Sequence, residues 1–305
     1  MKTTKLTLAL AGLMIASAAI VSSCKKKEAT STPDTNATSA SDNTMAEKQS
    51  NDAENIGAQA NENGSLSTFR LAGGGASPMG VGSVTGFGTG TVTVTFHDSL
   101  GADGHTRNGT IVFSVSPAGA HYRDSGMVMT ISTPGNTYYV DGNQVEITKT
   151  ITNNGRIASG NNMQWTIHSN ITINKAGGGT VTWTANRTHT LLNTGAVSTY
   201  NGMSVPTAYN GTSLPISWNV AIIQINGSSS GTSADGVTFT ASSNNVVRNM
   251  NCAPITSRPH FHPFCAGTID FNPAGKTTRV LNFGTGNCST TYTISIGSWS
   301  ETVNW

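Results

Sequence analysis

The residues best suited to chemistry lie close together in the stretch RPHFHPFC, which covers residues 258–265. His260 and His262 are two positions apart, so on an extended segment both side chains point to the same side. With Cys265 they offer three ligands of the kind that zinc prefers. Their spacing matches no zinc signature, and the two flanking prolines favour a stiff loop. The sequence therefore favours a loop between strands, with a metal site at the two histidines as the alternative.

Two acid–histidine pairs are the other candidates for catalysis. Asp103 lies two residues before His105, and His121 lies three residues before Asp124. A hydrolase would need these four groups to converge in one cleft. Strung along separate turns they would instead form salt pairs, which is the role that the sequence favours. No residue is therefore assigned as catalytic.

Other catalytic signatures are weak. The stretch GSSSG at residues 227–231 matches the G-x-S-x-G pattern of hydrolases, but its Ser- and Gly-rich surroundings do not predict the strand-to-helix turn that the nucleophile needs. Most acidic residues of the folded part lie in turns, whereas a glycosidase needs two carboxylates about 5–10 Å apart. No phosphate-binding loop, dinucleotide fingerprint or haem motif is visible, so we expect no cofactor. The sequence favours a protein that is not an enzyme.

The elements that must position these residues are strands. Polar and apolar residues alternate over five or six positions in several runs, which is typical of half-buried antiparallel strands. The clearest runs are TVTVTF, MQWTI, TVTWT and TYTISI, which begin at residues 91, 163, 180 and 291. Asp-Gly and Asn-Gly pairs between such runs predict hairpins. No stretch has an amphipathic helical period of useful length. We expect a single all-β domain at residues 67–305, built as a large antiparallel meander of roughly a dozen strands, in a sandwich or a rolled sheet.

The polar positions of these runs are mainly Thr, Ser and Asn rather than Lys and Glu. Thr-x-Thr recurs at residues 91–95, 148–152 and 180–184. Such ladders mark some ice-binding proteins, but Thr is also a good strand former and the ladders have no fixed period. The sequence therefore favours ordinary solvent-facing strand surfaces.

The N-terminus predicts a lipoprotein signal. Lys2 and Lys5 precede an apolar run, and Val21-Ser22-Ser23-Cys24 resembles the bacterial lipobox. The run is about 16 residues long, shorter than the roughly 20 that cross a bilayer. We expect residues 1–23 to be a signal peptide and Cys24 to carry the lipid anchor. An ordinary signal peptide with an incidental Cys24 is the alternative.

Residues 24–66 predict a disordered tether. They are mostly Ser, Thr, Asn, Ala and charged residues, and they offer too little apolar surface to offset the entropy of ordering. The part that follows carries 11 Lys and Arg against 8 Asp and Glu. This small, scattered excess predicts no nucleic-acid footprint.

Several stretches carry a specific resemblance, and they occur in order along the chain. They include DGHTRNGTIVFSV from residue 103, YRDSGMVMTIS from residue 122, GTVTWTANRT from residue 179 and VLNFGTGNCSTTYTISI from residue 280. Most of residues 90–305 resembles a family of uncharacterised β-rich lipoproteins from Bacteroidota. Its members have a lipobox, a tether and Gly-punctuated strands that end in a Phe-Gly-x-Gly-x-Cys motif, here residues 283–288. The resemblance implies a compartment and a fold but no reaction.

Three cysteines follow Cys24, and an odd number in an oxidising compartment leaves a thiol outside any intramolecular bridge. Similar sequences carry their pair at the positions of Cys252 and Cys288, so the resemblance favours a Cys252–Cys288 disulfide. A Cys265–Cys288 disulfide is the alternative.

These observations predict a lipid-anchored protein of the outer membrane or cell surface, on its periplasmic or extracellular face. The favoured function is a non-catalytic binding or surface-interaction module whose polar sheet or loops contact a glycan or a protein, and no nucleic acid. Trp183 is expected in the core, and Tyr200 and Tyr209 are the better aromatic contacts. The alternative is a hydrolase that acts on envelope or environmental polymers through the acid–histidine pairs.

Overall fold

The computed structural model describes residues 37–63, 81–100, 105–157, 162–192, 198–200, 203–205, 221–249, 252 and 264–304. Residues 35–305 form one compact unit, and the following description concerns that unit. Some predictions fall outside the described residues and stay predictions. These are the predictions for the signal peptide at residues 1–23 and for Cys24, Asp103, Tyr209, His260 and His262, and the side chain of Tyr200 is likewise outside the described part.

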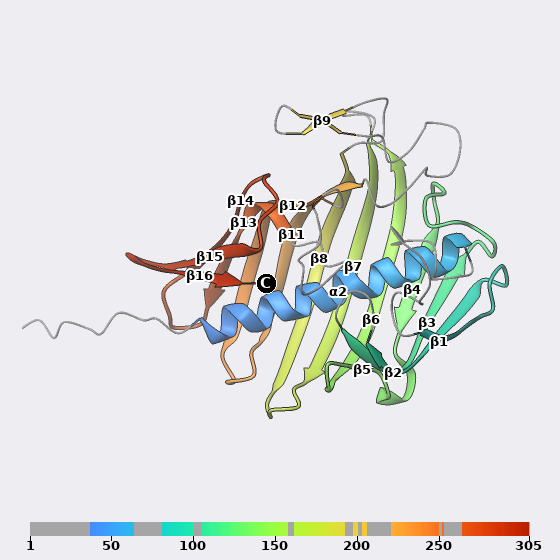
Figure 1. Ribbon diagram of the computed structural model, residues 1–305, viewed down its shortest axis with the longest axis horizontal. Helices are drawn as coiled ribbons and strands as arrows, with labels where there is room; N and C mark the ends of the chain where they lie inside the picture. The colour runs from blue at the N-terminus through green and yellow to red at the C-terminus, as the bar shows by residue number, and fades with distance from the viewer. Residues whose placement is uncertain are drawn as a thin grey trace, which may run out of the picture. The chain divides into compact units, whose positions relative to one another are not determined.

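Fourteen strands form one antiparallel sheet (Figure 1). In chain order its strands are β1 (Val81–Thr85), β2 (Thr91–Leu100), β3 (Thr106–Ser116), β4 (Val128–Ser132), β5 (Tyr139–Val140), β6 (Asn143–Arg156), β7 (Met163–Asn174), β8 (Thr180–Leu191), β11 (Ile222–Thr232), β12 (Thr238–Asn249), β13 (Phe264–Pro273), β14 (Arg279–Thr285), β15 (Thr291–Ile296) and β16 (Trp299–Asn304). A short 3-10 helix, η1 (Pro134–Asn136), precedes β5. Two further strands, β9 (Ser198–Tyr200) and β10 (Met203–Val205), pair only with each other.

The sheet is a meander, because nearly every strand pairs with the strands that precede and follow it in the chain. Its order is β1-β2-β3-β4-β6-β7-β8-β11-β12-β13-β14-β15-β16, and the short β5 pairs with β3 and β6 beside this path. The predicted all-β antiparallel meander is confirmed, and it takes the form of one extended sheet.

Alternating burial along the strands follows the alternation of residue types in the sequence. In β7 and β8 nearly every second side chain is buried, and Trp165 and Trp183 are among the largest of these. Trp183 therefore lies in the core, as predicted. Because side chains of a strand point alternately to its two faces, one face of the sheet collects the apolar residues and the other faces solvent. We call these the inner and the outer face.

A helix, α2 (Thr38–Asn63), lies across the inner face of the sheet, and its axis crosses the strands (Figure 1). It contacts β2, β4, β6, β7 and β8. This helix corrects the prediction that residues 24–66 are a disordered tether over their whole length. Its sequence is rich in Asn, Ser, Ala and acidic residues and has no apolar stripe, which is why periodicity gave no helix signal.

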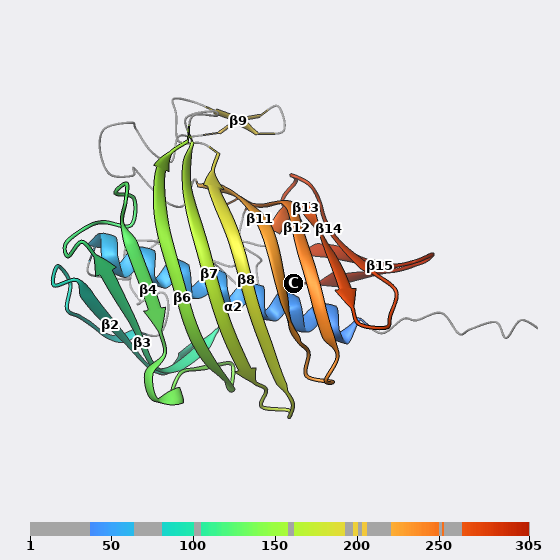
Figure 2. The ribbon, with the colours of Figure 1, turned by 180° about the vertical axis from the view of Figure 1, so that it is seen from behind.

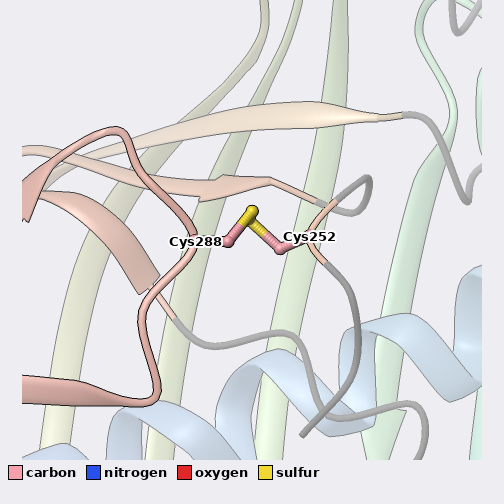
Figure 3. The surroundings of a disulfide bond; sticks show 2 residues. All are labelled: Cys252 and Cys288. Atoms are coloured by element: carbon pink, nitrogen blue, oxygen red, sulfur yellow. A yellow bond between two sulfur atoms is a disulfide. The ribbon is translucent and has the colours of Figure 1, made fainter.

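A disulfide joins Cys252, which follows β12, to Cys288, which follows β14 (Figure 3). The predicted Cys252–Cys288 pair is confirmed, and it replaces the alternative pair of Cys265 with Cys288. Strand β13 lies between β12 and β14 and carries Cys265, whose thiol is buried. The bridge thus links the two neighbours of β13.

In the described residues, no helix combines the length and the apolar character needed to cross a membrane.

Candidate functional site

His105 lies just before β3 and takes part in a chain of three polar side chains. Its Nδ1 is 2.6 Å from Oδ2 of Asp141, and its Nε2 is 2.7 Å from Nζ of Lys48 on α2. An ammonium group only donates, so Nε2 accepts and Nδ1 carries the proton that is donated to Asp141. Burial opposes ionisation of Asp141, but the hydrogen bonds from His105 and from the backbone N–H of Thr106 outweigh it and lower the pKa of this carboxyl group. Lys48 thus occupies the nitrogen that a general base would use.

The second predicted pair lies elsewhere in the fold. Nδ1 of His121 is 3.5 Å from Oδ2 of Asp124, and this oxygen also accepts a hydrogen bond from the backbone N–H of His121 at 2.7 Å. His105 precedes β3 and His121 follows it, and a strand of 11 residues is roughly 35 Å long. The structure therefore places these two histidines near opposite ends of β3, each with its own carboxylate.

The contact between α2 and the inner face of the sheet is built on buried charges, and its centre is Glu54. Oε2 of Glu54 is 2.7 Å from Nζ of Lys149 on β6, and Oε1 is 3.0 Å from Nδ1 of His189 on β8. Tyr122 donates its hydroxyl proton to Oε1 at 2.6 Å. Burial opposes ionisation, but the charges and hydrogen bonds of His189 and Lys149 hold the pKa of Glu54 well below its usual range. Lys149 also donates to the backbone oxygen and the hydroxyl of Ser50, at 2.9 and 3.0 Å.

Two more carboxylates of α2 face arginines of the sheet. Arg187 on β8 binds Glu47 through two atoms, Nη2 at 2.6 Å and Nε at 3.2 Å, and both side chains are 2% exposed. Asp52 lies between Arg107 of β3, at 3.6 Å, and Arg248 of β12, at 4.0 Å. The bidentate Arg187–Glu47 contact is stronger than the contacts of Asp52, because each carboxylate oxygen of Glu47 receives its own charged hydrogen bond.

The N-terminal part of α2 is fixed in the same way. Oδ1 of Asp42 is 2.8 Å from Nζ of Lys175, and Oδ1 of Asn43 accepts from the indole N–H of Trp183 at 3.0 Å. Ser229 of β11 donates to the same Asn43 oxygen at 3.3 Å. Polar contacts thus hold α2 along most of its length.

The composition of residues 24–66 predicts a tether, so it gave no signal for this network of buried charges. A signal was present in the strands: Lys149 and Arg187 occupy positions that alternation assigns to the inner face, where apolar residues are expected. A buried cation requires a partner. The acidic segment at residues 42–54 holds four of the chain's carboxylates and was the richest source of partners.

The described part of the chain contains no group of three or more His, Cys, Asp or Glu side chains that could hold a metal ion. The predicted metal ligands His260 and His262 fall outside that part.

Figure 2 views the sheet from its outer face, with α2 behind the strands. This face carries hydroxyl and amide side chains in register. One row crosses seven neighbouring strands, from β4 to β13, and all of its side chains are exposed. It consists of Ser132, Thr148, Asn170, Thr184, Ser230, Thr240 and Asn272. At about 4.8 Å per strand the row is roughly 29 Å long. We call it the neutral row, because none of its side chains titrates.

A shallow depression of about 300 Å³ lies at the β4 end of the neutral row. The outer-face side chains of β4, β6, β7 and β8 line it together with η1. The polar residues that line it are Ser132, Thr133, Asn136, Glu146, Thr148, Asn170, Thr172, Thr182 and Thr184. Glu146 is the single carboxylate among these lining residues.

Large apolar side chains are scarce on the described surface. Phe87 and Tyr139 are the exposed ones, with 50% and 37% of their surface accessible, whereas Tyr138 is buried. The neutral row therefore contains no aromatic platform.

Comparison with known proteins gives no relative: no family model, no curated protein and no solved structure matches the chain. The resemblance to Bacteroidota lipoproteins accordingly stays a prediction.

Proposed function

We propose that the chain is a lipid-anchored protein of the cell envelope that binds a neutral, polyhydroxylated polymer, such as a glycan, through the outer face of its sheet. The anchor is Cys24 of the lipobox-like sequence. In this proposal the protein is a binding module and does not catalyse a reaction.

The neutral row is the observation that carries the proposal. Hydroxyl and amide groups both donate and accept hydrogen bonds, and so do the hydroxyl groups of a sugar chain. Seven such residues in register present a repeating set of donors and acceptors over roughly 29 Å. The absence of charge along the row matches a neutral polymer better than an acidic one.

The depression supports binding rather than hydrolysis. A glycosidase needs two carboxylates about 5–10 Å apart, and Glu146 is the one carboxylate that lines the depression. A hydrolase working through the acid–histidine pairs is the weaker alternative, since His105 and His121 lie near opposite ends of β3 and Lys48 covers one of them.

Binding is tested by co-sedimentation of the purified Cys24→Ala protein with an insoluble neutral β-glucan. An insoluble acidic polysaccharide of similar particle size serves as the comparison. We expect the protein to sediment with the neutral polymer and to be released by its soluble oligosaccharides. Thr184→Lys and Ser230→Lys put charged side chains into the row and should weaken binding at least tenfold.

Ser300→Lys is the matched control, because Ser300 is an exposed residue of β16 outside the neutral row. It should bind like the parent protein. Equal sedimentation of all variants, or binding to the acidic polymer alone, would refute the role of the row. Binding to a protein-coated surface but to neither polysaccharide would point to a protein ligand instead.

The anchor is tested separately by palmitate labelling and by shaving of intact cells with protease. The parent chain should incorporate the label and fractionate with membranes, whereas Cys24→Ala should do neither. If the Cys24→Ala variant still fractionates with membranes, Cys24 is not the anchor. This outcome does not affect the test of polymer binding.

A further inference from the structure

The interface between α2 and the inner face has the character of a docking interface. Its polar contacts come from Asp42, Asn43, Glu47, Lys48, Ser50, Asp52, Glu54 and Asn61 of α2. We propose that the inner face is a docking site for an acidic helix, and that α2 of a second copy of this chain docks there in exchange for the chain's own α2.

The charges of α2 and of the inner face are complementary. Four strands contribute one buried cation each to the α2 interface, and these are Arg107, Lys149, Arg187 and Arg248. Glu47, Asp52 and Glu54 of α2 face them. Replacing buried ion pairs by apolar residues of similar volume is often neutral or stabilising. A need for stability therefore does not explain why this interface uses buried charges. The buried cations do specify which segment fits the inner face: a helix whose carboxylates are spaced like those of Glu47, Asp52 and Glu54.

Several buried polar atoms of the interface are left without a hydrogen bond. Nη1 of Arg187, Nε2 of His189 and Nδ2 of Asn43 are buried, and within the described residues none of these atoms has a hydrogen-bond partner. Ser229 bonds both Arg187 and Asn43, so two of these atoms belong to one cluster. Interfaces between exchangeable partners are polar in this way, whereas permanent ones are more apolar.

A second copy of the chain carries the segment that fits the inner face. The segment known to fit the inner face is α2 itself, and a second copy carries the same segment. Exchange replaces every contact with an identical one, so it leaves the contact energy of the pair of molecules unchanged. The helix gains its stability from the sheet rather than from its own sequence, so it would dock on one sheet or the other.

Trapping by disulfide formation tests the exchange in the full chain. Oγ of Ser50 on α2 is 3.2 Å from Oγ of Ser169 on β7. Two chains, both with Cys24→Ala, carry either Ser50→Cys or Ser169→Cys and different affinity tags. They are mixed, oxidised mildly and separated without reductant. We expect a mixed-tag covalent dimer, with a 50–169 cross-link identified by peptide mapping. Adding Glu47→Gln to the first chain should speed its appearance several-fold, because a seated helix with one ion pair fewer leaves more readily.

A matched control uses two neighbours within the sheet. Thr95 on β2 and Thr110 on β3 have hydroxyl oxygens 3.5 Å apart, and Thr95→Cys mixed with Thr110→Cys should give no dimer. Placing Ser50→Cys and Ser169→Cys in one chain should give a disulfide within that chain, which shows that α2 is seated in the variants.

Formation of that internal disulfide without any mixed-tag dimer, even after days of mixing, would overturn the proposal. A second outcome would also overturn it: the Ser169→Cys chain forms a disulfide with a free peptide of residues 38–63 that carries Ser50→Cys, but not with the full-length Ser50→Cys chain. The inner face would then admit a separate helix but not the helix of a second chain.

Discussion

Nζ of Lys149 and Oε2 of Glu54 lie 2.7 Å apart in the interior of the protein, although 95 residues separate them in the chain. Lys149 belongs to the longest strand of the sheet and Glu54 to the one α-helix among the described residues. The pair therefore joins the acidic, polar helix α2 to the inner face of the sheet.

Removing one partner of this pair should be costly. Glu54→Gln leaves a buried ammonium without its carboxylate, and Lys149→Met leaves a buried carboxylate with one cation fewer. We expect each variant to lose about 3–5 kcal/mol of unfolding free energy in urea titrations. The double variant should lose clearly less than the sum of the two.

The two single variants and the double variant form a double-mutant cycle, and Asp124→Asn is its control. It removes the partly exposed pair with His121 and should cost at most about 1 kcal/mol. Additive losses in the Glu54–Lys149 cycle would show that the two side chains do not interact in solution.

Acid should loosen α2. The pKa of Glu54 is lowered in the folded protein, so the unfolded chain binds a proton first, near the ordinary value of 4.5. This contribution to stability is complete above that pH and is progressively lost as the pH falls below it towards the folded-state value. The melting temperature of the parent protein should therefore fall below about pH 4.5, and Glu54→Gln should show a shallower fall. Parallel curves for the two proteins would contradict this assignment.

Gly57 of α2 should not tolerate a methyl group. Gly→Ala usually stabilises a helix by about 1 kcal/mol. Here an added Cβ would lie 2.5 Å from the ring of Phe113 and 2.9 Å from the sulfur of Met129, so α2 or these side chains must shift. We expect Gly57→Ala to destabilise the protein by about 1–3 kcal/mol, measured by chemical unfolding. Gly177→Ala, where the added atom meets open space, should change stability by no more than about 0.5 kcal/mol.

The cysteines should be distinguishable by labelling. In a Cys24→Ala chain, denaturation without reductant should expose one reactive thiol, at Cys265, and reduction should add Cys252 and Cys288. Replacing both bridged cysteines by Ser should cost about 3–4 kcal/mol, because the bridge closes a loop with a sequence separation of 36 residues. A thiol mapped to Cys252 or Cys288 before reduction would contradict the pairing.

The strands and their two faces could be predicted from the sequence, because an alternation of period two is a local property. The runs around Trp165 and Trp183 indicated strands, and alternation assigned Trp183 to the core. The Thr-x-Thr ladders placed Thr148 and Thr184 on the solvent side. The disulfide followed from a resemblance rather than from local pattern.

Helix α2 and the partners of the buried charges were decided by the tertiary structure. A helix without an apolar stripe has no local signal, and its stability comes from ion pairs with strands far along the chain; 140 residues separate Glu47 from Arg187. The partner of His105 is likewise Asp141 of the β5–β6 turn, which pairing of β5 with β3 brings alongside it. The sequence by itself determined which residues face inward, since each strand carries that information. Which of the inward charges meet was set only by folding, since those contacts join segments that no local pattern connects.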